Sequence, residues 1–169
     1  MRTLAAGLLL ALTLHAAAPV PRPAGVLTVL EPSGKQTPLA SLKGNVVVVQ
    51  FLLTTCPHCQ AFSKALNKIT TEFGPKVKVI GVAFDPADTG NAPTYIKTTG
   101  ATFPVGSADK LKVLQFLGVS VMDYPRLKVP QVVVIDKKGM IRSQTLLNGA
   151  GQAGDEIGIR PLLAALTKE

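Results

Sequence analysis

The two cysteines of this chain stand together in one short segment, Cys56-Pro57-His58-Cys59. A disulfide closed over so few residues is worth only about 2 kcal/mol in chain entropy, whereas a loop spanning a domain is worth more than about 4 kcal/mol. Such a cross-link stabilises a fold poorly. Two cysteines this close can instead cycle between dithiol and disulfide by exchange with other thiols. The spacing therefore favours redox chemistry over a structural disulfide.

The cysteine segment lies at an expected junction between a strand and a helix. Val46–Leu53 is a nearly continuous apolar run, typical of a central strand that is covered on both faces. A helix is predicted from Pro57 to about Glu72, because its apolar residues repeat every three or four positions. This buried stripe consists of Phe62, Leu66, Ile69 and Phe73.

The junction predicts different roles for the two sulfurs. Cys56 is expected at the helix N-terminus, where unpaired N–H groups and the helix dipole favour its thiolate form. Pro57 suits the first helical position, and a protonated His58 adds positive charge beside the sulfur. Cys59 lies one turn further along and is expected to be more buried. We therefore expect Cys56 to take part in the first exchange and Cys59 to resolve the mixed disulfide.

Metal and haem sites fit these residues less well. A metal site needs more ligands, since His58 is the one histidine outside residues 1–18. Haem attachment requires a histidine directly after the second cysteine, where Gln60 stands. We therefore predict no metal and no cofactor. Binding of a soft ion such as Cu(I) by the cysteines stays open as a non-enzymatic alternative.

Composition indicates one globular domain. The chain has 169 residues, of which 47% are hydrophobic, and a formal net charge of +8. Its lysines are scattered, it has no Trp, and its few aromatic residues do not interleave with the lysines. A solvated basic surface is therefore favoured over a nucleic-acid interface, which would need a stacking platform.

The N-terminus carries an expected targeting segment. Residues 1–18 combine a basic start, an apolar core over residues 4–14 and a small-residue end, as in a signal peptide. An uncleaved membrane anchor is the alternative, because Pro19 is an awkward neighbour for cleavage. Either way, we expect the domain over residues 26–169 in the periplasm or another extracytoplasmic space. Residues 19–25, with three prolines, are expected to form an extended linker outside the fold.

Hydrophobic periodicity and turn residues predict the remaining elements. They are a hairpin over 26–30 and 36–39, a helical turn over 39–42, a strand over 77–84, helices over 93–99 and 109–117, strands over 132–136 and 140–147, and a helix carried by 161–166. The strand–helix–strand units imply an α/β fold with parallel strands in the middle of the sheet and helices on its faces. The last strand pair makes one edge antiparallel.

These motifs together resemble a known family. A strand, CPHC, a helix and a later Val129-Pro130 ahead of a strand resemble the thioredoxin fold. The segments SGKQTPLASLKGNVVVVQF, VIGVAFD and VPQVVVIDKKGMI are similar to the TlpA/ResA-like thiol–disulfide oxidoreductases of bacterial envelopes, which share a redoxin, AhpC/TSA-like scaffold. The resemblance covers about residues 26–166. It implies a thioredoxin-like fold with a mixed sheet and an N-terminal β-hairpin, with Pro130 as a cis-proline facing the disulfide and the Val129 backbone pairing with substrate.

Two carboxylates of the resembled families are missing. Gln50 stands six residues before Cys56, where thioredoxins carry a buried acid. Phe62 stands three residues after Cys59, in place of the glutamate of ResA-type proteins. The sequence therefore does not show which group accepts the proton of Cys59.

The resemblance implies exchange with protein thiols and disulfides of the cell envelope and with a membrane or soluble redox partner. The scaffold resembles reductases, including those of cytochrome c maturation, whereas His58 and Val129 resemble DsbA-like oxidants. We expect a reductase and keep the oxidant as the alternative. Peroxide reduction is a third possibility, although Leu53 stands where peroxiredoxins need Thr or Ser.

A long stretch between Gly118 and Pro130 departs from the family's usual short connection. Because it leads into the proline loop, it is expected to lie near the substrate-facing surface. We hypothesise that Tyr124 and Arg126, within this stretch, help to select a partner. The alternative is an ordinary surface insertion.

Overall fold

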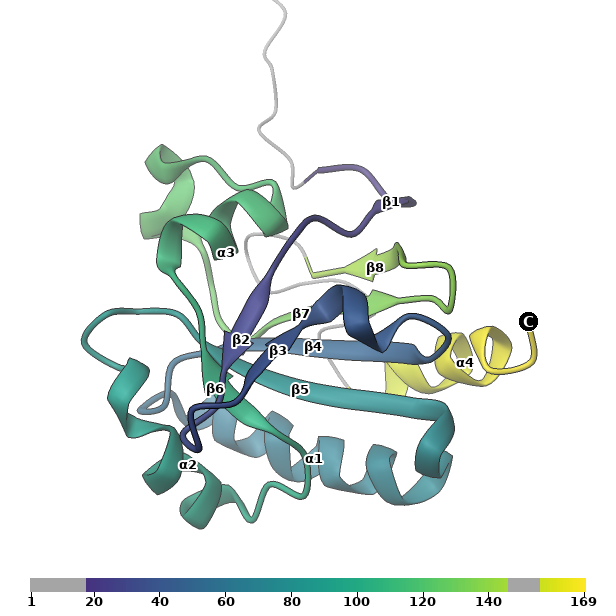
Figure 1. Ribbon diagram of the computed structural model, residues 1–169, viewed down its shortest axis with the longest axis horizontal. Helices are drawn as coiled ribbons and strands as arrows, with labels where there is room; N and C mark the ends of the chain where they lie inside the picture. Colours follow the sequence, from purple (N-terminus) through teal and green to yellow (C-terminus); the bar gives the residue numbers. More distant parts are fainter. Residues whose placement is uncertain (1–17, 146–155) are drawn as a thin grey trace, which may run out of the picture.

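The computed structural model describes residues 18–145 and 156–169. Within them the strands form one mixed sheet in the order β1-β8-β7-β4-β5-β6-β2-β3. Its centre is parallel: β4 (Val46–Leu52) pairs with β5 (Val77–Ala83), and β5 pairs with β6 (Val105–Ser107). The predicted α/β, thioredoxin-like class with a mixed sheet between helices is confirmed (Figure 1).

Both flanks of the sheet are antiparallel. On one side β7 (Gln131–Ile135) pairs with β4, and β8 (Met140–Gln144) pairs with β7. On the other side β2 (Thr28–Leu30) and β3 (Gln36–Pro38) form the expected N-terminal hairpin. The sequence indicates one antiparallel edge, whereas the structure has two, because β2 also pairs antiparallel with β6.

The valine-rich strand β4 is buried along its whole length, as the sequence predicts. Alternate residues enter two separate cores, because successive side chains of a strand point to opposite faces. Val46 and Val48 face a core that includes residues of α1 (Pro57–Phe73), α2 (Ala92–Thr99) and α4 (Glu156–Leu166). Val47 and Val49 face a second core that includes residues of α3 (Lys110–Leu117). Figure 1 shows α1 and α3 on opposite sides of the central strands.

Helix α1 begins and ends where the sequence predicts. Pro57 occupies its first position, and Phe62, Leu66 and Ile69 of the expected stripe are buried. Burying each such side chain contributes roughly 1.5–3 kcal/mol, which fixes the rotation of the helix against the sheet. The helix stops at Gly74, whose φ of 55° is easily adopted without a side chain. The cysteine segment is thereby held at the end of β4.

Short 3-10 turns connect several of the larger elements. They are η1 (Leu39–Leu42), η2 (Gly74–Lys76), η3 (Thr89–Asn91) and η4 (Val121–Arg126). The first is the helical turn that the sequence predicts. The last lies within the long stretch before Pro130 and gives it a defined backbone.

Strand β6 is missing from the sequence prediction. It has only three residues, and Gly106 at its centre weakens any strand pattern. The close crossing of β2 requires this glycine, because a Cβ there would lie 2.4 Å from the Leu30 carbonyl oxygen. Only the pairing with β5 and β2 identifies these residues as a strand.

The prediction that residues 19–25 form a linker outside the fold is wrong for residues 22 and 23. Arg22 and Pro23 form β1, which pairs with the outer edge of β8. The Arg22 guanidinium donates hydrogen bonds to the Phe116 carbonyl at 3.0 Å and to Gln144 Oε1 at 2.6 Å. An edge position tolerates a proline, because one side of an edge strand needs no donor. These contacts hold the segment in the fold.

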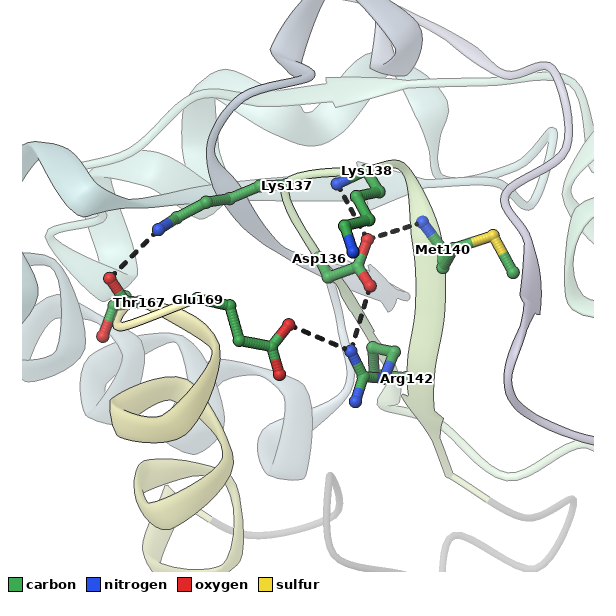
Figure 2. A network of polar contacts seen from close by, with 7 residues as sticks. All are labelled: Asp136, Lys137, Lys138, Met140, Arg142, Thr167 and Glu169. Carbon is green, nitrogen blue, oxygen red and sulfur yellow. Dashed lines mark hydrogen bonds and ion pairs between the residues drawn. The ribbon is translucent and has the colours of Figure 1, made fainter.

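A polar network fastens the β7–β8 turn to the end of α4 (Figure 2). Asp136 accepts hydrogen bonds from the N–H groups of Lys138 and Met140 and from Arg142. Burial alone would raise the pKa of Asp136, but these hydrogen bonds outweigh it and lower that pKa. Arg142 also contacts Glu169 at 3.3 Å, and Lys137 donates to the Thr167 carbonyl at 3.0 Å.

The expected export signal or anchor lies outside the described residues, apart from Ala18. In the described part of the chain, no helix is both long and apolar enough to cross a bilayer. The last residues of the predicted strand over 140–147 also fall outside that part; β8 itself ends at Gln144.

Candidate active site

Cys56 and Cys59 lie where β4 gives way to α1. Cys56 is the N-cap of the helix, and its Sγ accepts a hydrogen bond from the N–H of Cys59 at 3.2 Å. Both cysteines are free thiols, and the first is half-buried while the second is completely buried. The N-cap contact places the sulfur at the positive end of the helix dipole, which favours an anion there. Of the two sulfurs, that of the half-buried Cys56 is therefore the one that a substrate can reach.

The proline loop faces this sulfur. The Val129–Pro130 peptide bond is cis, as the resemblance implies, and the Val129 carbonyl oxygen lies 3.8 Å from Cys56 Sγ. Val129 is half-buried and packs against both cores. A backbone segment held this close to the reactive sulfur can align an extended substrate by main-chain hydrogen bonds.

Cys59 is completely buried behind Cys56. Burial raises its pKa, the hydrogen bond with Cys56 raises it further, and the negative charge of Asp88 adds to the same effect. The buried thiol therefore keeps its proton until the first exchange has taken place. The roles of Cys56 and Cys59 in the exchange stay a prediction.

A buried neutral network lies beneath Cys59. The Cys59 carbonyl accepts hydrogen bonds from Gln50 Nε2 at 2.9 Å and from the Tyr95 hydroxyl at 2.8 Å. Ser63 Oγ donates to Gln50 Oε1 at 2.7 Å and lies 2.7 Å from the Tyr95 hydroxyl. Gln50 thus occupies the site of the missing acid, and both its amide nitrogen and its amide oxygen are hydrogen-bonded. Sequence reasoning missed Ser63 and Tyr95, because hydrophilic residues on apolar helix faces give no signal of their partners.

A buried carboxylate, that of Asp88, supports the segment before Cys56, and the sequence analysis did not identify it. Asp88, in the loop after β5, is buried and accepts hydrogen bonds from both the backbone N–H and the hydroxyl of Thr54. Gln60 Nε2 donates to the Thr54 carbonyl at 2.9 Å. The clue in the sequence was the position of Asp88 after a strand parallel to β4, since carboxyl ends of parallel strands meet at one edge.

The other predicted site residues, His58, Tyr124 and Arg126, differ in how far their side chains are exposed. His58 is exposed on the first turn of α1, beside the pair. Tyr124 is half-buried, and its hydroxyl donates to Asp85 at 2.7 Å, so its polar end faces the protein. Arg126 is 80% exposed and lies 3.9 Å from Asp123. Of the two residues expected to select a partner, Arg126 therefore presents its guanidinium group to solvent, whereas the hydroxyl of Tyr124 is bonded within the protein.

No group of three or more potential metal-ligating side chains occurs within residues 18–145 and 156–169. Cys56 and Cys59 are the two thiol ligands of the chain. A soft ion bound there would have the two thiolates as its protein ligands, and this alternative stays a prediction.

The fold, the cysteine pair at a helix start and the facing cis-proline define a thioredoxin-like protein. More particularly, residues 20–144 match the AhpC/TSA family, and the chain belongs to this family. The thioredoxin-like protein YneN of Bacillus subtilis is 27% identical over 112 residues, which cover 65% of this chain and 61% of YneN. The chain thus matches about three fifths of that relative.

Solved structures share the fold over most of its length. A thiol:disulfide interchange protein of the thioredoxin family from Chlorobium tepidum has a TM-score of 0.68 at 22% identity, covering 89% of this chain and 99% of that chain. A secreted disulfide oxidoreductase of Mycobacterium tuberculosis has a TM-score of 0.61 at 23% identity, with coverages of 85% and 96%. The fold implied by the resemblance is therefore confirmed.

Proposed function

We propose that this chain is an exported thiol–disulfide oxidoreductase that exchanges its Cys56–Cys59 pair with protein disulfides, as a reductase. One observation carries the proposal. The half-buried sulfur of Cys56 caps α1 and lies 3.8 Å from the Val129 carbonyl of the cis-proline loop, with the buried thiol of Cys59 directly behind it. A structural cross-link would need neither an accessible sulfur nor an aligned backbone beside it.

The proposed reaction proceeds by two successive thiol–disulfide exchange steps. The Cys56 thiolate attacks one sulfur of a substrate disulfide, forms a mixed disulfide and releases the other substrate sulfur as a thiolate, which takes up a proton. Cys59 then loses its proton and attacks Cys56 Sγ, which releases the second substrate thiol and closes the Cys56–Cys59 disulfide. The substrate gains two electrons and the enzyme loses two. A separate dithiol partner must return them.

The reducing direction rests on the resemblance of the scaffold, over about residues 26–166, to reductases. Strong oxidants of this kind hold their dithiol form by a greatly stabilised thiolate at the accessible cysteine, here Cys56, which raises their reduction potential. The reduction potential of the Cys56–Cys59 pair therefore decides between the two directions.

The extracytoplasmic location rests on residues 1–18, which have the composition of a signal peptide, and on the similarity to a secreted oxidoreductase. The proposed substrates are envelope proteins with accessible disulfides, apocytochromes c among them. A reporter that is active only outside the cytoplasm, fused after residue 25, tests the location. Activity lost on removal of residues 2–18 supports export, and an inactive full fusion contradicts it.

The direction is tested by equilibrating the full chain with redox buffers and quantifying the Cys56–Cys59 disulfide. A reduction potential below about −200 mV supports a reductase, and a value near −120 mV identifies an oxidant instead. Peroxide consumption is measured on the same sample. Turnover of peroxide that exceeds turnover of a protein disulfide contradicts the proposal.

The substrate class is tested by trapping. The Cys59→Ser variant cannot resolve the mixed disulfide, so we expect it to accumulate covalent adducts with envelope proteins that dithiothreitol releases. Cys56→Ser is the matched control and should yield no adducts. Equal labelling by both variants, or tight Cu(I) binding with no adducts, contradicts exchange as the function.

A further inference from the structure

The loop that follows β5 carries two aspartates that bond in different directions. Asp85 Oδ2 accepts a hydrogen bond from the Tyr124 hydroxyl at 2.7 Å. Asp88 accepts hydrogen bonds from the backbone N–H and the hydroxyl of Thr54. The loop is itself tied together, because the Asp88 N–H donates to the Asp85 carbonyl at 2.9 Å and the Ala87 N–H donates to Asp85 Oδ1 at 3.0 Å. It therefore links two segments that are distant in the sequence.

The Asp85 side holds the segment that leads to the cis-proline. The Tyr124 ring lies edge-on to Phe84, with centroids 6.4 Å apart, and Lys110 Nζ lies 3.9 Å above its centroid. The Leu127 N–H donates to the Tyr124 carbonyl at 3.0 Å. Only Lys128 then separates Leu127 from Val129. The position of the Val129 carbonyl is thus coupled to Asp85 through a well-packed aromatic side chain.

The Asp88 side holds the segment that carries the reactive sulfur. Thr54 lies two residues before Cys56, and its carbonyl accepts from Gln60 Nε2 at 2.9 Å. The Cys56 N–H donates to the Leu53 carbonyl at 3.1 Å, so the turn before the helix is fixed on both sides of Thr54. A buried carboxylate with two hydrogen bonds to one residue leaves that residue little freedom.

We infer that the loop Asp85–Asp88 is a brace that sets the position of Cys56 Sγ relative to the Val129 carbonyl, and that both aspartates are positioning residues for disulfide exchange with peptide substrates. The inference rests on the proposed function. A substrate must present its disulfide in line with the sulfur while its backbone pairs with the proline loop. Displacing either group by about 1 Å can lower the rate about 100-fold.

The two sides of the brace predict different kinetic defects. Loss of the Asp85–Tyr124 bond should affect substrates that pair with the proline loop and spare small disulfides that do not. Loss of the Asp88–Thr54 bonds should affect both, because it displaces the sulfur. On the Asp85 side, a merely structural role would lower both rates together or neither. On the Asp88 side, rescue of the rate by Asp88→Asn separates positioning from a loss of folding.

The experiment compares Tyr124→Phe with wild type in two assays of the full chain. One uses a disulfide-bonded peptide, and the other uses 5,5′-dithiobis(2-nitrobenzoic acid), which has no peptide backbone. We expect Tyr124→Phe to lower kcat/KM for the peptide about tenfold and to leave the small disulfide within twofold. Thr54→Val should lower both. Thr37→Val is the matched control, because it removes a hydroxyl–carboxylate bond to Glu31 in the N-terminal hairpin.

Comparing Asp88→Asn with Asp88→Ala distinguishes a positioning role of Asp88 from a role in folding. Asp88→Asn can still accept from the Thr54 N–H and donate to its hydroxyl, so it should retain the rate with the small disulfide within about threefold, whereas Asp88→Ala should not. If Asp88→Ala does not fold, Thr54→Val replaces it. Tyr124→Phe with unchanged rates on both disulfides, or with equal losses on both, overturns the brace. A wild-type chain that reduces neither disulfide overturns the proposed function as well.

Discussion

In the neutral network beneath Cys59, Gln50 and Tyr95 can each replace the other as a hydrogen-bond partner, which predicts the effect of removing one or both. The Cys59 carbonyl and Ser63 Oγ each have two side-chain partners, Gln50 and Tyr95. Tyr95→Phe removes the hydrogen bond that the Tyr95 hydroxyl donates to the Cys59 carbonyl, together with its contact with Ser63 Oγ, but leaves both groups bonded to Gln50. At a net value of about 1 kcal/mol for each bond, we expect a loss of about 1–2 kcal/mol in the free energy of unfolding. Gln50→Leu should cost about as much for the same reason.

The double variant removes both partners at once. The hydroxyl of Ser63 and the carbonyl of Cys59 then lose every side-chain partner in the network, and a stranded buried polar group costs about 1–3 kcal/mol. We therefore expect the double variant to lose about 1–3 kcal/mol more than the sum of the two single losses. Two contacts that acted independently would show no such excess.

Urea unfolding of the reduced protein at pH 7 measures these free energies, with the dependence on urea concentration checked for equality among variants. Repeating the cycle in a Ser63→Ala background is the control, because it removes the stranded hydroxyl and should shrink the excess. Additivity within about 0.5 kcal/mol would refute the reasoning, since that is the behaviour of independent sites.

Three further predictions concern single groups. Iodoacetamide should modify Cys56 at least tenfold faster than the fully buried Cys59 in the folded protein, and mass spectrometry of native against urea-treated samples checks this. Asp136→Ala should cost about 2–4 kcal/mol at pH 7, measured by urea unfolding; because hydrogen bonds lower the pKa of Asp136, the difference should be complete above about pH 4 and vanish as pH falls through that lowered pKa. Burial and the bond to Asp85 raise the pKa of Tyr124 to about 12, so folding should lose stability from about pH 10 upward, and Asp85→Ala should lower that pKa in an ultraviolet titration.

The sequence was most informative where structure depends on neighbouring residues. The start of α1 followed from Pro57 after an apolar strand, and its end from Gly74. The predicted place of Cys56 at the helix start, with Cys59 one turn further on, followed from the same junction. In each case backbone geometry and a repeating apolar pattern act within a few residues, so the chain itself carries the information.

Elements and contacts formed between distant segments were not predictable in the same way. Strands β1 and β6 have two and three residues, too few for a periodic pattern, and exist because partner strands lie beside them. Thr54 and Asp88 are 34 residues apart, and Asp85 and Tyr124 are 39 residues apart.

The sequence by itself therefore determined the reactive pair, the helix that carries it and the class of sheet behind it. Only the tertiary structure decided which polar groups support the pair and the segment before the proline loop: an amide network in place of a buried acid, Asp88 bonded to Thr54, and Asp85 bonded to Tyr124. The physical reason is that a hydrogen bond depends on the three-dimensional placement of both partners, and parallel pairing of β4 with β5 sets that placement for the loops at their ends.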